Sequence, residues 1–242
     1  MLNIYDPAFV KKLFNRMSAS YERMNYITSL GFSLIWRHQF IDTIKTSDQP
    51  VQVLDLLSGL GENWSILLKK FPNGKFVALD FSESMIQSSS KKNHKKLNNR
   101  FLILQQDILA NELHEGKYDI ITCAFGLKTF DEEQLQQLAK RVFNALKKDG
   151  KFSFIEISMP PNKILCFFYK LYLSKIIPVL GSLFLGNPSD YKLLWVYTEK
   201  FKNCNKAKLI FEENGLHVKY KSYFFGCATG LIGTKQPTTN TL

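Results

Sequence analysis

Acidic residues and a glycine pair stand where the first strands of this sequence are expected to end. The stretch VLDLLSGLGENW, residues 53–64, runs through Asp55 to Gly59 and Gly61, and a helical pattern follows it. Glycine permits positive φ and close backbone approach to a ligand, and a helix that begins here offers free N–H groups to a carboxylate. Asp80 ends the next apolar run, where its carboxylate can accept hydrogen bonds from two adjacent ribose hydroxyls.

A third acid and an aromatic-glycine turn extend this set. Asp107 ends the third apolar run, and its carboxylate together with the N–H of Ile108 is suited to an adenine edge. The fourth run ends in Phe125, Gly126 and Leu127, beside the reacting end of a ligand held by the earlier strands. Any one aspartate could simply cap the turn after it, but the ordered set favours a nucleoside with a charged amino-acid tail.

Other nucleotide sites fit this pattern less well. A dinucleotide fingerprint would have a third glycine at position 64, where the chain has Trp64. A phosphate-binding loop would need a Lys-Ser or Lys-Thr pair, which this loop lacks. Three carboxylates also repel a polyanion. NAD and nucleoside triphosphates are therefore disfavoured.

The elements that must position these residues alternate between strand and helix. Near-continuous apolar runs predict strands over 51–57, 75–81, 100–107, 117–125 and 151–158. Helical patterns lie between them at 62–71, 82–97 and 131–150. This rhythm predicts a doubly wound α/β sheet that is covered by helices on both faces.

Two stretches interrupt the rhythm. Residues 1–50 are helical in pattern and form an N-terminal cap, and the aromatic-rich residues 159–202, broken by prolines, form an insertion. The chain then continues with a helix over about 203–214 and strands at 217–225 and 227–235. We expect a single domain over 1–242, with a frayed tail at 236–242.

Composition limits the compartment and the partners. A net charge of +11 favours anionic partners, but the basic run 91–100 is expected to be a solvated helix face, and no nucleic-acid partner is expected without a separate binding module. The cysteines form no CxxC pair and no apolar signal segment opens the chain, which predicts a cytoplasmic protein with reduced thiols. The histidines lack ligand spacing, so no metal site is expected.

The stretch 164–186, ILCFFYKLYLSKIIPVLGSLFLG, is apolar but not a clean membrane span. Lys170, Lys175 and Pro178 interrupt it. We expect either a lid over the substrate or an amphipathic segment in peripheral contact with a membrane. The two interpretations overlap, because a lid over an apolar substrate would use the same composition.

Together these motifs resemble the class I S-adenosylmethionine (SAM) methyltransferases, and within them the ubiquinone/menaquinone C-methyltransferase family. The likeness covers nearly the whole chain. VLDLLSGLGE, ALDFSESM and YDIITCAFGLKTF match the loop, ribose and fourth-strand motifs. The more specific matches are the opening LFNRMSASYERMNYITSLGFSLIWR and the insertion YKLYLSKIIPVLGSLFLGNPSDYKLLWVYTEKF. The resemblance implies a seven-stranded Rossmann-like sheet with an antiparallel last strand, N-terminal helices and a helical insertion before the last helix.

The resemblance also implies SAM-dependent methylation of a ring carbon in a prenylated benzoquinol or naphthoquinol. A ring carbon becomes nucleophilic when a neighbouring hydroxyl loses its proton, and Lys128 or Arg37 is the cation expected to stabilise the phenolate. Tyr21 and Tyr191 are expected to close the pocket. The expected cofactor contacts are Tyr21, Asp55, Ser58, Gly59, Gly61, Asp80, Phe81, Met85, Asp107, Ile108 and Phe125.

Two departures from the family pattern leave other functions open. Lys128-Thr129 stands where the family's fourth-strand motif usually continues with Arg-Asn, and Leu57 stands before the loop where small residues are common. The alternatives are a paralogue that methylates carbon, oxygen or nitrogen of another small molecule, and a SAM-binding partner in a biosynthetic complex without turnover. The sequence does not determine the oligomeric state, and a homodimer is one assembly that it leaves open.

Overall fold

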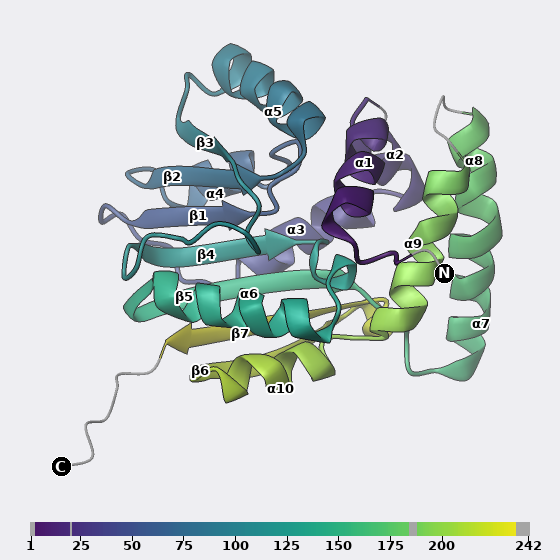
Figure 1. Ribbon diagram of the computed structural model, residues 1–242. Coiled ribbons are helices and arrows are strands. Elements are labelled where there is room, and N and C mark those ends of the chain that lie inside the picture. Colours follow the sequence, from purple (N-terminus) through teal and green to yellow (C-terminus); the bar gives the residue numbers. More distant parts are fainter. Residues whose placement is uncertain (1–2, 20, 184–187, 236–242) are drawn as a thin grey trace.

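The computed structural model describes residues 3–19, 21–183 and 188–235, which form a seven-stranded sheet in the order β3-β2-β1-β4-β5-β7-β6 (Figure 1). The strands are β1 (Gln52–Leu56), β2 (Lys75–Asp80), β3 (Phe101–Gln105), β4 (Tyr118–Ala124), β5 (Leu146–Ile157), β6 (Leu216–Tyr223) and β7 (Ala228–Lys235). Strands β1 to β5 are parallel, whereas β7 is antiparallel to β5 and β6. The predicted α/β sheet with an antiparallel last strand is confirmed. The tail predicted to fray lies outside the described residues.

Helices cover both faces of this sheet. Helices α6 and α10 pack on one face around Phe152 and Phe211, and α3 and α4 pack on the other around Phe40 and Trp64. The helices are α1 (Pro7–Met17), α2 (Tyr21–Thr28), α3 (Phe32–Ile41), α4 (Trp64–Lys70), α5 (Glu83–Lys96), α6 (Glu132–Ala145), α7 (Lys163–Leu171), α8 (Ile177–Leu183), α9 (Pro188–Phe201) and α10 (Asn205–Glu213). Short turns of helix are η1 (Leu127–Thr129), the π-helical η2 (Tyr172–Ile176) and η3 (Phe224–Gly226).

The helix predicted over 131–150 is shorter than its pattern indicated. It begins as expected, because the Asp131 side chain and the Gln134 side chain each accept the other's backbone N–H in a capping box. It ends at Ala145, because Leu146 pairs with Tyr118 of β4 and already belongs to β5. Pairing within the sheet therefore overrides the helical pattern of the last residues.

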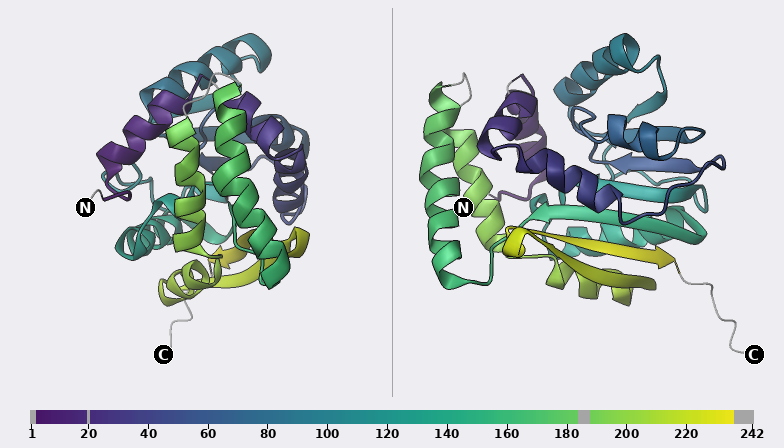
Figure 2. Two further views of the ribbon diagram at one scale, coloured as in Figure 1. Left: turned by 90° about the vertical axis from the view of Figure 1, so that its right-hand side faces the viewer. Right: turned by 180° about the vertical axis from the view of Figure 1, so that it is seen from behind.

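The N-terminal helices and the insertion lie together at one end of the sheet. Figure 2 shows α7, α8 and α9 beside α1 and α2, beyond the carboxyl ends of the parallel strands. Met24 of α2 shares an apolar core with Leu173, Ile177, Tyr191 and Trp195 of the insertion. Because ligands of open α/β sheets bind at this end, the two segments form a roof over the site.

Polar contacts hold α1 in this roof. Asn15 donates to Glu83 at 2.8 Å and accepts from the Ser82 hydroxyl at 2.6 Å, at the start of α5. Arg16 makes two hydrogen bonds to the buried Asp190 of α9, at 2.6 and 3.2 Å. Helix α1 thereby joins the end of β2 to the insertion.

Candidate active site

The loop between β1 and α4 has the backbone that its glycines predicted. Gly59 and Gly61 have φ of +53° and +69°, and Leu57 before them has φ of +51°. A Cβ on Gly61 would lie 2.4 Å from the Trp64 indole, whereas a Cβ on Gly59 would meet nothing within 4 Å. Gly61 is therefore needed for packing, and Gly59 leaves open space in front of the loop. The Gly59 N–H donates to Asp80 Oδ2 at 2.9 Å, which ties the loop to the end of β2.

Asp80 and Asp107 face the same cleft in front of this loop. Asp80 Oδ1 accepts from the Ser82 N–H at 2.9 Å, and burial raises the pKa of this carboxyl group. Asp107 Oδ1 accepts from the Leu109 N–H at 2.9 Å. Both acids therefore cap the turns that follow them. An ionised carboxylate has about four acceptor positions, so each keeps capacity for a ligand.

Nine of the eleven expected cofactor contacts line this cleft together. They are Tyr21, Ser58, Gly59, Asp80, Phe81, Met85, Asp107, Ile108 and Phe125. Gly61 lies behind the loop, against Trp64, and Asp55 lies beneath it. The cleft combines carboxylates from two strand ends with apolar walls from Met85 and Ile108, which suits a nucleoside.

Asp55 supports the loop from below. Its side chain is fully buried, and Oδ1 accepts from Asn63 Nδ2 at 3.0 Å and from Thr122 Oγ1 at 2.8 Å. Burial raises the pKa of this carboxyl group to about 6. Asp55 therefore connects β1, the start of α4 and β4 behind the cleft. Sequence reasoning missed Asn63 and Thr122, whose polar side chains are adjacent to this acid only in the folded chain.

Arg37 lies on the cofactor side of the site. Its guanidinium donates to Glu62 at 2.7 Å and to Asn63 Oδ1 at 2.7 Å, and it lies 4.9 Å from the centre of the Phe125 ring. Only 4% of Arg37 is exposed. The expected role for Arg37 was phenolate stabilisation, but the structure places it against the acid after the second loop glycine. It fixes the loop and neutralises Glu62 next to the cleft.

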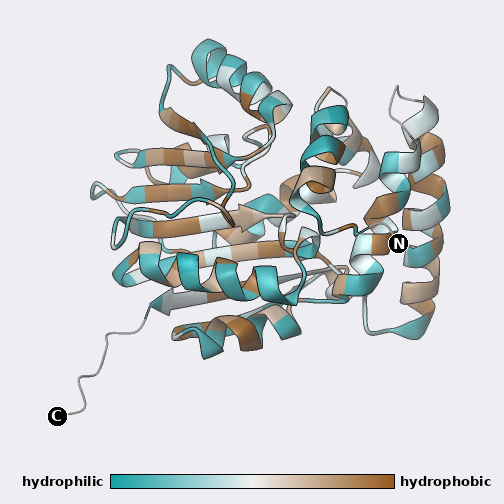
Figure 3. Ribbon diagram, in the orientation of Figure 1, coloured by the Kyte–Doolittle hydropathy of each residue, from teal (hydrophilic) through white to brown (hydrophobic). Residues whose placement is uncertain are grey.

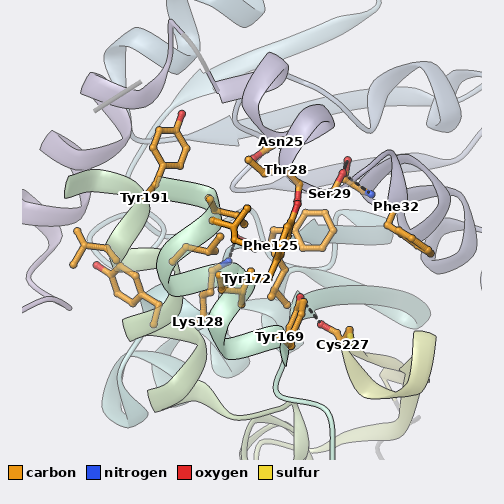
Figure 4. Close-up of a pocket in the computed structure, with 18 of the residues that line it drawn as sticks. Asn25, Thr28, Ser29, Phe32, Phe125, Lys128, Tyr169, Tyr172, Tyr191 and Cys227 are labelled. Carbon is orange, nitrogen blue, oxygen red and sulfur yellow. Dashed lines mark hydrogen bonds between the residues drawn. The ribbon is translucent and has the colours of Figure 1, made fainter. Parts of the chain in front are cut away.

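A second, larger cavity opens under the N-terminal helices and the insertion. Its volume is about 500 Å³ and its lining is mostly apolar, with residues from α1, α2, α3, η2, α9 and η3 (Figure 4). Phe14, Tyr21, Phe125 and Thr129 line both the cleft and this cavity. A ligand in the cleft and a second ligand in the cavity would therefore meet at these side chains.

Lys128 lies in the wall of the larger cavity, beside Phe125 in Figure 4. Its ammonium donates to Glu156 Oε1 at 2.6 Å and to the carbonyl oxygen of Phe125 at 3.1 Å. Glu156 is fully buried and also accepts the backbone N–H groups of Lys128 and Ile157, at 3.0 and 2.7 Å. Lys128 is 7% exposed, so it does not point to solvent. One N–H of its ammonium remains for a ligand in the cavity.

Glu156 is the residue that sequence reasoning missed most clearly. It is a single acid inside the apolar run FSFIEI, and it is the last residue but one of β5, the strand beside β4. An acid in such a run can be fully buried only with a charged or hydrogen-bonding partner. That signal could have identified a paired acid, but the partner 28 residues earlier is visible only in the fold.

The tyrosines are placed as walls of the cavities. Tyr21 lines both cavities, and burial and the charge of Glu62 raise the pKa of its hydroxyl. Tyr191 is 4% exposed and packs against Gly181, where a Cβ would lie 2.7 Å from its ring. The Tyr169 and Tyr172 hydroxyls donate to the carbonyl oxygens of Cys227 and Thr28, at 3.3 and 2.9 Å. Sequence reasoning had singled out only Tyr21 and Tyr191.

The cleft fits SAM by the chemistry of its side chains. The Ser58 hydroxyl is buried and has no hydrogen-bond partner in the described structure, which leaves a donor for a ligand at the loop. Asp80 has acceptor capacity for ribose hydroxyls, and Gly59 leaves room for close approach. With this sheet order and this loop, the fold and the cleft define a class I SAM-dependent methyltransferase.

Comparison with known proteins identifies the family. The profile of the ubiE/COQ5 methyltransferase family matches residues 2–235, so the chain belongs to that family. It is 31% identical to the demethylmenaquinone methyltransferase of Lactobacillus johnsonii, over 85% of this chain and 84% of that protein. It is 27% identical to the demethylmenaquinone methyltransferase of Thermus thermophilus, over 92% of this chain and 100% of that protein. Among solved structures, a SAM-dependent methyltransferase from Aquifex aeolicus has the same fold, with a TM-score of 0.57 and 18% identity over 82% of this chain and 89% of that one.

Proposed function

We propose that this enzyme transfers the methyl group of SAM to a ring carbon of a quinol that carries a prenyl chain, as in menaquinone biosynthesis. The observation that carries this proposal is the apolar cavity of about 500 Å³, which shares Phe125 with the cofactor cleft and has Lys128 in its wall. A prenylated ring needs an apolar space and a polar contact for its hydroxyl group. Two relatives that span most of the chain are demethylmenaquinone methyltransferases.

Bound SAM supplies a methyl group that its sulfonium has already activated. The protein must therefore position the acceptor and keep water away. Gly59, Asp80 and Asp107 would hold the nucleoside end of SAM, and Phe125 lies where the two cavities meet. Side chains of α1, α2 and the insertion, most of them apolar, line the cavity around this meeting point, which disfavours water there.

Lys128 holds the oxygen next to the reacting carbon. Its ammonium is fixed by Glu156 and by the carbonyl oxygen of Phe125, so one N–H can donate to a ring hydroxyl or its anion. Such a fixed donor stabilises the phenolate that makes the neighbouring carbon nucleophilic. Glu156 positions the ammonium and balances its charge in a wall that has little contact with water.

An alternative within the same class is methylation of another small molecule at carbon, oxygen or nitrogen. Lys128-Thr129 in place of the family's usual Arg-Asn pair supports it, because lysine is a compact charge that controls ring orientation less than a planar arginine fork.

Location is part of the proposal. A prenylated acceptor lies in a bilayer, so we propose a cytoplasmic enzyme in peripheral contact with a membrane through residues 164–186. The helical segment Lys163–Ser182 supports this, because it is long and apolar enough to cross a membrane by length and composition, yet only 22% of its most apolar window is buried. Residues 184–186 of the predicted segment lie outside the described part of the chain.

The proposal is tested with purified protein, SAM labelled in its methyl group and two reduced acceptors. One acceptor is a prenylated naphthoquinol without the ring methyl group, and the other is the same ring already methylated at that carbon. Label in the first product alone supports the proposal. Failure to label any quinol, with SAM binding intact, would favour another acceptor.

A further inference from the structure

Helix α7 turns an apolar stripe toward solvent. Residues with large apolar side chains recur at positions i, i+3, i+4 and i+7 of this helix, which places them on one face. The exposed fractions are 72% for Ile164, 65% for Phe167, 60% for Phe168 and 45% for Leu171. In a soluble protein such a stripe normally faces the core, and Figure 3 shows this helix coloured as predominantly hydrophobic.

The π-helical turn η2 keeps the stripe aligned beyond α7. A π turn contains one residue more than an α-helical turn. The residue five positions after Leu171 therefore lies on the same face as Leu171, where an α-helix would have the residue four positions later. That residue, Ile176, is 44% exposed, and Val179 after it is 59% exposed. Lys163–Ser182 therefore presents one continuous apolar face to solvent.

Two further segments expose large apolar side chains next to this face. Leu30, between α2 and α3, is 76% exposed. Phe224 and Phe225 of η3 are 47% and 76% exposed, and their φ values are +40° and +54°. Positive φ is costly for bulky residues and persists where a function or the surrounding structure requires it. The side chain of Phe225 extends largely into solvent, so burial of its ring does not offset that cost.

The three segments are held together around the mouth of the apolar cavity. Phe224 packs on Phe32 of α3 with ring centres 4.4 Å apart. The Tyr172 hydroxyl bonds to Thr28 of α2, and the Tyr169 hydroxyl bonds to Cys227 after η3. Figure 2, left, shows α7 beside the η3 turn at this end of the molecule. Side chains that are exposed on this face and also line the cavity are Leu30, Phe168, Leu171, Ile176 and Phe224.

We propose that α7–η2–α8, the α2–α3 turn and η3 form one docking face, which seats the mouth of the acceptor cavity on an anionic phospholipid surface. Residues 160–183 contain Lys163, Lys170 and Lys175, all exposed, and no Asp or Glu. Apolar side chains bordered by lysines are the composition that binds an anionic membrane interface. In a dimer formed through this face, the lysines of the two copies would lie close together, and their like charges would repel each other.

This inference rests on the proposed lipid-like acceptor and adds two contact segments to the proposed membrane segment. An acceptor with a prenyl chain would then pass from the bilayer into the cavity without crossing water. Because η2 and α8 also pack on α9, the segment lies in the plane of the interface as part of the fold and does not cross the bilayer.

Vesicle co-sedimentation of the full chain tests the face. The vesicles are equal parts phosphatidylcholine and phosphatidylglycerol, and the test variant is Phe167→Gln with Phe225→Asn, two residues that do not line either cavity. Asparagine tolerates positive φ, so the turn is kept. The matched control is Leu102→Thr with Leu209→Gln, on β3 and α10, whose side chains are 58% and 57% exposed.

We expect the test variant to bind the vesicles about 10- to 100-fold more weakly than the unaltered protein, from the loss of two apolar side chains, and the control to bind like the unaltered protein. Binding should also weaken as salt is raised. Equal binding of the test variant, equal loss in the control, or no binding by the unaltered protein overturns the proposal. A dimer in lipid-free solution that the test variant dissociates would overturn it too, because the face would then be a protein interface.

Turnover of a water-soluble, short-chain quinol separates this inference from the proposed function. The test variant should methylate that acceptor at the unaltered rate. If vesicle binding is lost while this turnover is unchanged, both proposals stand. If the unaltered protein binds vesicles but methylates no quinol, the docking face stands and the proposed acceptor fails.

Discussion

Replacing Lys128 has two separable consequences, because the residue is both half of a buried ion pair and a wall of the acceptor cavity. Lys128→Met keeps most of the side-chain volume but leaves Glu156 fully buried without its counter-charge, 2.6 Å from where the ammonium stood. Removing one partner of a buried pair costs about 3–5 kcal/mol. For a chain of this size each kcal/mol lowers Tm by about 2–4 °C, so we expect a fall of roughly 6–20 °C.

The double variant Lys128→Met with Glu156→Gln separates the two effects. The two oxygens of Glu156 accept different backbone N–H groups, Oε2 from Lys128 and Oε1 from Ile157, so glutamine can keep only one of these hydrogen bonds, but no unpaired charge is left buried. We expect part of the lost stability to return. The methylation rate should remain about 10- to 1000-fold below that of the unaltered enzyme, because the donor to the acceptor oxygen is still missing.

Three measurements decide between the outcomes. Thermal unfolding reports the ion pair, calorimetry with SAM reports the cofactor cleft, and single-turnover methyl transfer reports the chemistry. SAM affinity should stay near that of the unaltered enzyme in both variants. Full turnover in the double variant would remove Lys128 from the mechanism, and loss of SAM binding would move its role to the cofactor cleft. An unchanged Tm in Lys128→Met would contradict the buried ion pair itself.

Three further predictions concern the cofactor side of the site. Asp80→Ala should weaken SAM binding by about 2–3 kcal/mol, because charge-assisted hydrogen bonds to the ribose are lost, while circular dichroism shows an unchanged fold. Equal SAM affinity of the two proteins in calorimetry would contradict the role of Asp80. Burial raises the pKa of Asp55 to about 6 in the folded protein, compared with 3.8 for an ordinary aspartate. The free energy of unfolding should therefore fall as pH rises from 3.8 to 6, by up to about 3 kcal/mol. Asp55→Asn should flatten that part of the curve of Tm against pH, and an equally steep curve would refute the cause. A Cβ on Gly126 would lie 2.4 Å from Leu57 Cδ1, so Gly126→Ala should lower the free energy of unfolding in denaturant by about 1–3 kcal/mol. Adding Leu57→Ala should restore part of this loss, and no recovery would show that the contact is not its cause.

The sequence predicted the sheet, and the gathering of Gly59, Asp80 and Asp107 at one edge of it, for a local reason. Each strand is an apolar run that ends in a polar or glycine-containing turn, and parallel strands bring those ends to one edge. Gly59 and Asp80, 21 residues apart, are therefore adjacent through a topology that the pattern itself specifies. The same logic brought Asp107 to the cleft.

The positions of the two expected cations could not be predicted in this way, because their contacts join segments with no common pattern. Glu156 pairs with Lys128 across two strands, and Arg37 pairs with Glu62 across the N-terminal cap and the loop. Lys128 and Arg37 were both expected near the acceptor. The cavity that each one faces is set by the acid with which it forms an ion pair. Likewise, the end of α6 at Ala145 depends on the pairing of Leu146 with Tyr118, which lies outside the helix itself.

The position of the transferred methyl group tests the central claim most directly. The enzyme is supplied with SAM carrying a ¹³C-methyl group and a prenylated quinol without the ring methyl group, and the product is analysed by mass spectrometry and NMR. We predict one labelled methyl group bonded to a ring carbon. A label on a hydroxyl oxygen, or a label that appears only in an acceptor without a quinol ring, would contradict it.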